Sequence, residues 1–330
     1  MKKILVTGGA GYIGSHTIIE LVKSGYFPII IDNLCNSSIN NIHGIEKIIG
    51  KEFRWHNIDC TDKLKMQKIF LEECDIEAVI HFAAYKSVEE SVNKPKKYHD
   101  NNVGSLNVVL ECMKDKNIQN IIFSSSCTVY GMPDILPVEE SAPFKKAESP
   151  YGETKQICEK ILLSNPCNSI SLRYFNPIGS YSSALIGDCS ADKASNLVPI
   201  ITETVIGRRK EITVFGDDYN TSDGTCIRDY IHVVDLAKSH VSALEFILNQ
   251  SGKHVFNIGT GNGVSVLEAI KTFEKANNLK VNYSIGKRRS GDIEKIYADT
   301  KLAKQKLDWE PKKTLKDAMI SAWNWEKMKE

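Results

Sequence analysis

A tyrosine and a lysine four residues apart are the pair best suited to acid–base chemistry in this sequence. They occur in Tyr151-Gly152-Glu153-Thr154-Lys155, a spacing that puts both side chains on one face of a helix that Ser149 and Pro150 can begin. A phenol with a pKa of about 10 must lose about three units, or about 4 kcal/mol, to act as a base near pH 7. A positive charge about 4 Å away can supply that much, so Lys155 together with a second positive charge would suffice.

The position of Tyr151 distinguishes it from two other tyrosines with the same spacing. Tyr283 and Tyr297 also have a lysine four residues on, so the spacing alone proves little. Only Tyr151 opens a helix after a predicted strand that ends in Ser124-Ser125-Ser126, and ligands of open α/β sheets bind at the carboxyl ends of the strands. We therefore predict that the Ser126 hydroxyl hydrogen-bonds the reacting oxygen.

A glycine-rich turn predicts a dinucleotide site. Gly8, Gly11 and Gly14 follow an apolar run and precede a helical pattern, where free amides at a helix N-terminus can receive a diphosphate. Asp32 ends the next predicted strand 18 residues after Gly14, near the usual place of the acid that binds an adenosine ribose. Because an acid there repels a 2′-phosphate, the sequence favours NAD over NADP.

The elements that position these residues alternate between apolar runs and helical segments, which predicts an α/β fold with a doubly wound, Rossmann-type parallel sheet. A smaller, interleaved α/β domain is predicted to take over after Pro177. The expected ranges are 1–176 plus about 230–262 for the first domain and about 177–229 plus 263–330 for the second. The predicted strands of the first sheet are Lys3–Thr7, Ile29–Asp32, Phe53–Asp59, Ala78–Phe82, Asn120–Ser125 and Ser169–Phe175, with Tyr230–Asp235 and His254–Ile258 returning to it.

Composition excludes several classes of function. With 42 Lys+Arg against 41 Asp+Glu the net charge is +1, so there is no basic surplus for nucleic acid or an anionic membrane. No apolar run approaches the about 18 residues of a membrane helix, and the one after Met1 is too short for a secretory signal. The nine cysteines lack zinc-ligand spacing. We expect a cytoplasmic protein without a metal site.

Other motifs leave their interpretation open. Arg228 and Arg289 each stand near an acid in the second domain, as Arg228-Asp229 and as Arg289 with Asp292. Such pairs are compatible with a diphosphate clamp and equally with solvated loops. No phosphate-binding loop, serine-hydrolase elbow or zinc-protease motif is present.

With these residues in place, the sequence resembles the extended short-chain dehydrogenase/reductase family, and within it the epimerases that act on UDP-hexoses. The similarity spans nearly the whole chain. It is carried by the segments Val6–Thr17, Asp32–Ser37, Ser124–Gly131, Ser149–Gly152, Leu172–Pro177 and Gly224–His232.

The resemblance implies a role for each matching position. Tyr151 resembles the base, Lys155 the residue that lowers its pKa and holds the nicotinamide ribose, and Ser126 the hydroxyl that orients the sugar 4-oxygen. The implied NAD contacts are Gly8, Gly11, Tyr12, Ile13, Gly14, Asp32, Asn33, Leu34, Cys35, Asn36, Ser37, Asp59, Cys60, Phe82, Ala83, Ala84, Lys86, Asn101, Ser124, Tyr151, Lys155 and Phe175. The implied UDP-sugar contacts are Lys86, Ser126, Tyr151, Tyr174, Asn176, Asn196, Leu197, Thr213, Val214, Phe215, Arg228, Arg289, Asp292 and Ile296.

The activity that the resemblance implies is interconversion of UDP-galactose and UDP-glucose, by oxidation at C4 to a 4-keto sugar, rotation and re-reduction with bound NAD. The implied assembly is a homodimer. A 4,6-dehydratase of the same family needs an Asp-Glu pair after the catalytic hydroxyl, and Cys127 and Thr128 stand there. Two alternatives stay open: epimerisation of UDP-N-acetylglucosamine, since Ile296 is intermediate in size, and an NAD sensor without catalysis.

Overall fold

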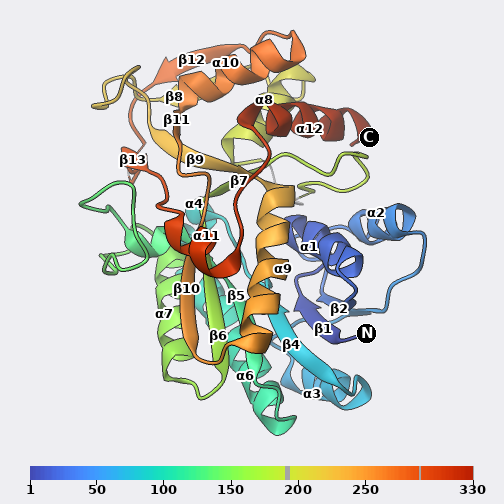
Figure 1. Ribbon diagram of the computed structural model, residues 1–330. Coiled ribbons are helices and arrows are strands. Elements are labelled where there is room, and N and C mark those ends of the chain that lie inside the picture. Colours follow the sequence, from blue (N-terminus) through green and yellow to red (C-terminus); the bar gives the residue numbers. More distant parts are fainter. Residues whose placement is uncertain (190–193, 290, 330) are drawn as a thin grey trace.

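The computed structural model of this chain describes residues 1–189, 194–289 and 291–329. Its centre is a seven-stranded parallel sheet with strand order β10-β6-β5-β4-β1-β2-β3 (Figure 1). The first half of the chain forms, in order, β1 (Lys3–Thr7), α1 (Tyr12–Lys23), β2 (Phe27–Asp32), α2 (Ile39–Ile49), β3 (Trp55–Asn57), α3 (Lys63–Glu72), β4 (Ile76–His81), α4 (Val88–Asn93), α5 (Pro95–Tyr98), the π-helical turn η1 (His99–Val103), α6 (Gly104–Asp115), β5 (Asn120–Ser126), the 3-10 turn η2 (Cys127–Tyr130), α7 (Pro150–Ser164) and β6 (Asn168–Tyr174).

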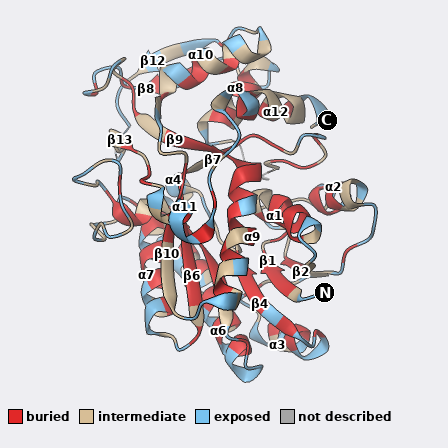
Figure 2. Cartoon of the chain, in the orientation of Figure 1, coloured by how far each residue is buried: buried red, intermediate tan, exposed pale blue. Residues whose placement is uncertain are grey.

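The central sheet is buried on both faces, because apolar residues predominate in its central strands and point to both sides. Ile4 and Val6 of β1 point into one core and Leu5 into the other, as expected when successive side chains leave opposite faces. Helices α1 and α9 cover the first face, and α3, α6 and α7 contribute to the core on the second. In Figure 2 most of the central strands are largely buried, as in β1 and β6, and the outer helix faces are exposed.

The second half of the chain builds a smaller unit above the carboxyl ends of the sheet (Figure 1). Strands β11, β9 and β13 form one small sheet with β7 paired to β9, and β12 pairs with β8. The elements in chain order are β7 (Asn176–Ile178), α8 (Leu197–Val205), β8 (Ile212–Phe215), β9 (Ile227–His232), α9 (Val233–Asn249), β10 (Lys253–Ile258), β11 (Gly263–Ser265), α10 (Val266–Asn277), β12 (Tyr283–Gly286), β13 (Lys295–Ile296), α11 (Lys301–Leu307) and α12 (Leu315–Met328).

The Rossmann-type sheet is confirmed, with one strand misassigned. The return of the chain through β10, beside β6, agrees with the prediction. The prediction that Tyr230–Asp235 also joins the first sheet is wrong: β9 ends at His232 and pairs with β7, β11 and β13, and α9 begins at Val233. An apolar run marks a buried strand without showing which sheet it enters. The domain ranges themselves stay a prediction.

The described part of the chain contains no helix with the length and apolarity needed to cross a membrane.

Candidate active site

A cavity of about 350 Å³ lies at the carboxyl ends of the central strands, between the sheet and the second half of the chain. Gly8 follows β1, Phe82 follows β4 and Ser126 ends β5, so three strands deliver residues to its wall. Asn176 and Leu197 close it from the opposite side. This placement is the general one for ligands of open α/β sheets.

Most of the predicted site residues line this cavity. On the cofactor side they are Gly8, Gly11, Tyr12, Ile13, Gly14, Asp32, Asn33, Cys35, Asn36, Ser37, Asp59, Cys60, Phe82, Ala83, Ala84, Lys86, Asn101, Ser124, Tyr151, Lys155 and Phe175. On the substrate side they are Lys86, Ser126, Tyr151, Tyr174, Asn176, Asn196 and Leu197. The predicted residues that do not line the cavity are Leu34, Thr213, Val214, Phe215, Arg228, Arg289, Asp292 and Ile296.

The side chains of Ser126, Tyr151 and Lys155 meet on one wall. Ser126 ends β5 and its Oγ accepts a hydrogen bond from the Thr128 amide at 3.3 Å. Tyr151 stands in the first turn of α7, which Ser149 caps, and its hydroxyl is hydrogen-bonded to Ser126. The Nζ of Lys155 lies 5.8 Å from the centre of the Tyr151 ring. The strand end and the helix start thus bring together a hydroxyl, a phenol and an amine.

Burial dominates the electrostatics of this pair. It raises the pKa of Tyr151 to about 12, against a smaller lowering by the Ser126 hydrogen bond. It also lowers the pKa of Lys155 to about 8, which Cys158 and Glu159 partly oppose. The protein without its cofactor therefore keeps the phenol protonated, and the lowering of its pKa by Lys155 stays a prediction for the cofactor-bound site. The Lys155 ammonium donates to the Ser124 carbonyl at 2.6 Å.

The glycine-rich turn has the shape of a cradle for a diphosphate. Gly8 has a φ of +69°, and a Cβ there would lie 2.8 Å from the Ala83 amide nitrogen. A Cβ on Gly14 would lie 2.2 Å from the Gly8 carbonyl oxygen. Helix α1 starts directly after the turn, and Gly11 caps it without a side chain. No side chain therefore blocks the first-turn amides, which are free to bind an anion. These residues fit the diphosphate of a dinucleotide.

Asp32 organises the loop that follows β2. Its carboxylate accepts hydrogen bonds from the Ala10 amide at 3.0 Å, the Leu34 amide at 2.9 Å and the Ser37 hydroxyl at 2.8 Å. Burial raises its pKa while these bonds lower it. Leu34 has a φ of 57° and contributes its amide to Asp32 rather than a side chain to the cavity. The sequence indicated that Leu34 belongs to this loop. It could not show that the backbone there has a positive φ and directs the Leu34 amide to Asp32.

The remaining predicted substrate residues form a second group outside the cavity wall. Asp292 lies between two arginines, 2.7 Å from Arg289 and 3.8 Å from Arg228, and the Arg289 guanidinium lies 5.4 Å from the centre of the Phe215 ring. Thr213 and Val214 precede Phe215 on β8. Ile296 is 2% exposed in a small core with Phe175. Arginines, an acid and an aromatic ring therefore gather there, although Asp292 already neutralises the guanidinium charges in part.

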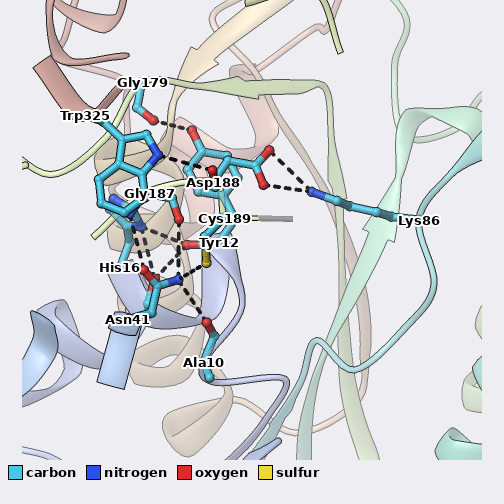
Figure 3. A network of polar contacts seen from close by, with 11 residues as sticks. Ala10, Tyr12, His16, Asn41, Lys86, Gly179, Gly187, Asp188, Cys189 and Trp325 are labelled. Atoms are coloured by element: carbon cyan, nitrogen blue, oxygen red, sulfur yellow. Dashed lines mark hydrogen bonds and ion pairs between the residues drawn. The ribbon is translucent and has the colours of Figure 1, made fainter. Parts of the chain in front are cut away.

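Several residues on the cavity wall were missed by the sequence reasoning. Cys127 and Thr128 directly follow Ser126, so their position next to a predicted site residue could have indicated that they line the cavity. Asp188 and Cys189 lie in an irregular segment with no motif, and no signal in the sequence marked them. Figure 3 shows Asp188 beside Lys86, with Tyr12 and Trp325 nearby.

A buried ion pair joins the strand and the helix next to the wall formed by Ser126, Tyr151 and Lys155. Arg173 of β6 donates to Glu159 of α7 through Nε at 3.0 Å and Nη2 at 2.7 Å, and neither side chain is more than 5% exposed. Ser125, next to Ser126, also donates to Glu159. Because Glu159 lies one turn after Lys155, the ion pair connects β6, and the Ser125 hydrogen bond connects the end of β5, to the helix that carries Tyr151 and Lys155.

Comparison with known proteins identifies relatives over nearly the whole chain. The model of a family described as GDP-mannose 4,6 dehydratase matches residues 5–321. The UDP-glucose 4-epimerase of Haemophilus influenzae is 46% identical over 329 residues, which cover 98% of this chain and 97% of the relative. The UDP-glucose 4-epimerase of Bacillus subtilis is 45% identical over 328 residues, 98% of this chain and 96% of the relative.

Solved structures agree with these relatives. The UDP-glucose 4-epimerase of Bifidobacterium longum, in complex with NAD⁺ and UDP, superposes with a TM-score of 0.95 at 44% identity, covering 99% of this chain and 98% of that one. The UDP-glucose 4-epimerase of Stenotrophomonas maltophila, with bound NAD and formylated UDP-arabinopyranose, superposes with a TM-score of 0.96 at 42% identity, covering 100% and 99%.

Proposed function

The chain belongs to the UDP-glucose 4-epimerase family, and from this premise we propose that it interconverts UDP-galactose and UDP-glucose with NAD as its bound cofactor. The observation that carries the proposal is the meeting of Ser126, Tyr151 and Lys155 on the wall of a cavity that also contains the glycine-rich turn. An NAD sensor without catalysis would have no use for this constellation.

The residues of the glycine-rich turn and Asp32 would hold NAD, and Lys155 would lie beside its nicotinamide. When bound, NAD would supply the hydride acceptor and donor for C4 of the hexose, and a positive charge in its oxidised form. Tyr151 takes the proton of the sugar 4-hydroxyl and gives it back, while Ser126 holds the 4-oxygen by a hydrogen bond. No cofactor is consumed, because oxidation and reduction occur on the same sugar.

The raised pKa of Tyr151 sets how much the cationic groups must contribute. From about 12 to near 7 the pKa must fall by about five units, or about 7 kcal/mol, rather than the three units of an ordinary phenol. A single charge even about 4 Å away supplies only about 4 kcal/mol at an effective dielectric constant near 20. Proton transfer therefore requires a charged Lys155 and the oxidised cofactor together. Tyr151 thus acts as a base only when the cofactor is bound.

Dehydration, the reaction in the description of the matched family model, lacks its residues here. A 4,6-dehydratase needs a carboxylic acid pair after the catalytic hydroxyl, and the cavity wall has Cys127 and Thr128 there. Burial raises the pKa of the Cys127 thiol to about 12, so it stays neutral and donates no proton near pH 7. The relatives at about 45% identity are UDP-glucose 4-epimerases, which favours epimerisation of UDP-glucose over that of UDP-N-acetylglucosamine.

The UDP half of the substrate is proposed to reach the group formed by Arg228, Arg289, Asp292 and Phe215, where two guanidinium groups suit a diphosphate. We also propose a cytoplasmic homodimer. All nine cysteines belong to the described residues and are free thiols, which supports a reducing compartment. Sedimentation velocity tests the assembly, since a dimer has twice the 36.9 kDa mass of the chain.

The proposed function is tested by adding UDP-galactose to the purified protein and following the sugar anomeric protons by NMR. We expect UDP-glucose to appear at a stable ratio without release of NADH. An accumulating 6-deoxy-4-keto sugar would replace epimerisation by dehydration. Absence of any conversion, even with added NAD, would contradict the proposal.

A further inference from the structure

Residues 185–189, here termed the 185–189 segment, contact α2, and α2 in turn contacts the glycine-rich turn. The Nδ2 of Asn41 donates to the Ala10 carbonyl at 2.9 Å, and the same nitrogen lies 3.4 Å from the Gly187 carbonyl and 3.1 Å from the Cys189 sulfur (Figure 3). A Cβ on Gly44 of α2 would lie 2.2 Å from the Leu185 carbonyl oxygen. The segment is thus in close contact with the helix that follows the Asp32 loop.

The C-terminal helix α12 fastens the segment from the other side. The indole Nε1 of Trp325 donates to the Asp188 carbonyl at 3.1 Å (Figure 3). Gly187 lies directly against the indole ring, since a Cβ there would lie 2.5 Å from its Cδ2 atom. Only glycine allows this approach without moving the segment or the ring. Two elements far apart in the sequence, α2 and α12, therefore hold the same short segment.

The segment forms part of the wall of the cavity. Asp188 and Cys189 line it together with Tyr12 and Lys86. Both carboxylate oxygens of Asp188 lie 3.4 Å from the Nζ of Lys86, which in turn lies 5.9 Å from the centre of the Tyr12 ring. Asp188 thus joins the segment to the loop after β4, across the half of the cavity that begins at the glycine-rich turn.

We propose that the 185–189 segment, held by Trp325 and Asn41, closes the cofactor half of the cavity and slows the dissociation of NAD. This inference rests on the proposed function, in which the reduced cofactor must stay until it returns its hydride. Dissociation requires the wall to move, and the contacts of Gly187 and Asp188 with Trp325 oppose that movement. Such a wall acts on the rate at which the cofactor leaves, without contributing to the chemical step.

The test compares NAD release from wild-type holoenzyme and two variants of α12. Trp325→Phe keeps an aromatic ring against Gly187 and removes the hydrogen bond to Asp188. Trp323→Phe is the matched control: it is the same change on the same helix, but its ring contacts Phe273 in the core of the second half. Bound NAD is quantified after removal of free NAD by gel filtration, at intervals, to give a first-order release rate.

We expect Trp325→Phe to release NAD about fivefold faster than wild type, as the loss of one hydrogen bond predicts, and Trp323→Phe to release it at the wild-type rate. Gly187→Ala, whose Cβ displaces the indole, is expected to release NAD about tenfold faster or more. Equal release rates in wild type, Trp325→Phe and Gly187→Ala overturn the inference. So does an equal acceleration by Trp323→Phe, which would assign the effect to the general stability of α12.

The wild-type protein separates this inference from the proposed function. If it holds NAD and epimerises UDP-galactose but the variants release NAD like wild type, only the role of the 185–189 segment fails. If wild type holds NAD without epimerising any UDP-hexose, the proposed function fails and the measured release rates still decide the role of the segment. A wild-type protein that holds no NAD overturns both.

Discussion

Tyr151 illustrates how a residue can be placed by the fold for a reaction that it cannot begin alone. Its phenol is hydrogen-bonded to Ser126 and buried, and burial raises its pKa to about 12. Lys155 is buried as well and has its pKa lowered to about 8. At neutral pH the site therefore holds a neutral phenol and a charged amine. In the proposed mechanism the base forms only when the bound cofactor adds further positive charge.

The first prediction at this scale concerns Tyr151→Phe. Removing the hydroxyl removes the base but leaves the glycine-rich turn and the Asp32 loop intact, so we expect NAD to stay bound while kcat falls by about 10²-fold to 10⁴-fold. The measurement is kcat for UDP-galactose together with the NAD content of the purified variant. A variant that epimerises at nearly the wild-type rate would refute the role of Tyr151 as base.

The second prediction is a pH dependence set by Lys155. Its ammonium is charged below a pKa of about 8 and neutral above it, so kcat should decline as the pH rises through about 8. Lys155→Arg keeps a positive charge throughout this range, so the decline should move to higher pH even though the rate at pH 7 falls. A decline at the same pH in both proteins would assign it to another group.

At the scale of elements, the start of α1 depends on two glycines that pack against each other. The close approach of Gly14 to the Gly8 carbonyl lets the helix begin immediately after β1, with its first amides free. Any side chain at Gly14 must push the turn apart. The geometry of the cofactor site is therefore a property of the strand–turn–helix unit and not of one side chain.

The third prediction compares two glycine substitutions. Gly14→Ala is expected to weaken NAD binding about tenfold or more, because a Cβ would lie 2.2 Å from a backbone oxygen. Gly104→Ala, at the start of α6, has only the Thr61 methyl within 4.0 Å and should leave NAD affinity unchanged while stabilising the protein by up to about 1 kcal/mol. Calorimetric titration of the cofactor-free proteins with NAD measures both affinities, and equal affinities would contradict the prediction.

The fourth prediction concerns the ion pair between α7 and β6. Glu159→Met leaves the Arg173 guanidinium buried without its partner, so the free energy of unfolding should fall by about 3–5 kcal/mol. Replacing both residues by Met should recover most of this loss. As a control, Lys304→Met breaks the exposed pair with Glu310 and should cost less than about 1 kcal/mol. Urea denaturation measures all three, and a loss as small for Glu159→Met as for Lys304→Met would contradict the prediction.

At the scale of the molecule, the two halves of the chain are built from each other's segments. Strand β9 lies in the second half, yet α9, which follows it directly, covers the first face of the central sheet beside α1. Strand β10 then completes the edge of that sheet next to β6. The core of the first half therefore depends on residues that follow the smaller sheet in the sequence.

The fifth prediction follows from this interleaving. A fragment of residues 1–178 contains β1–β6 but lacks α9 and β10, so it exposes the apolar face that Leu236 and Leu244 cover in the whole chain. We expect it to aggregate or to lack a cooperative thermal transition, whereas the whole chain unfolds cooperatively. Circular dichroism and size-exclusion chromatography distinguish these cases. A soluble, cooperatively folding fragment would show that the first half is self-sufficient.

The sequence alone was sufficient to predict the features that depend on a local pattern of residues. Near-continuous apolar runs identified most strands of the central sheet, because strands covered on both faces are apolar at most positions. The glycine spacing, Asp32 and the Tyr151–Lys155 pair indicated the cavity residues, because the ends of parallel strands meet at one edge. The family resemblance added the UDP-sugar, which no spacing could supply.

Only the tertiary structure decided what depends on contacts between distant segments. It assigned β9 to the smaller sheet, since an apolar run is compatible with any buried sheet. It showed that burial raises the pKa of Tyr151, because desolvation is set by everything packed around a group and not by its neighbours in sequence. It also brought Gly187 and Asp188 into contact with Trp325, which lies more than 130 residues later in the sequence. No sequence motif predicted this part of the cavity wall.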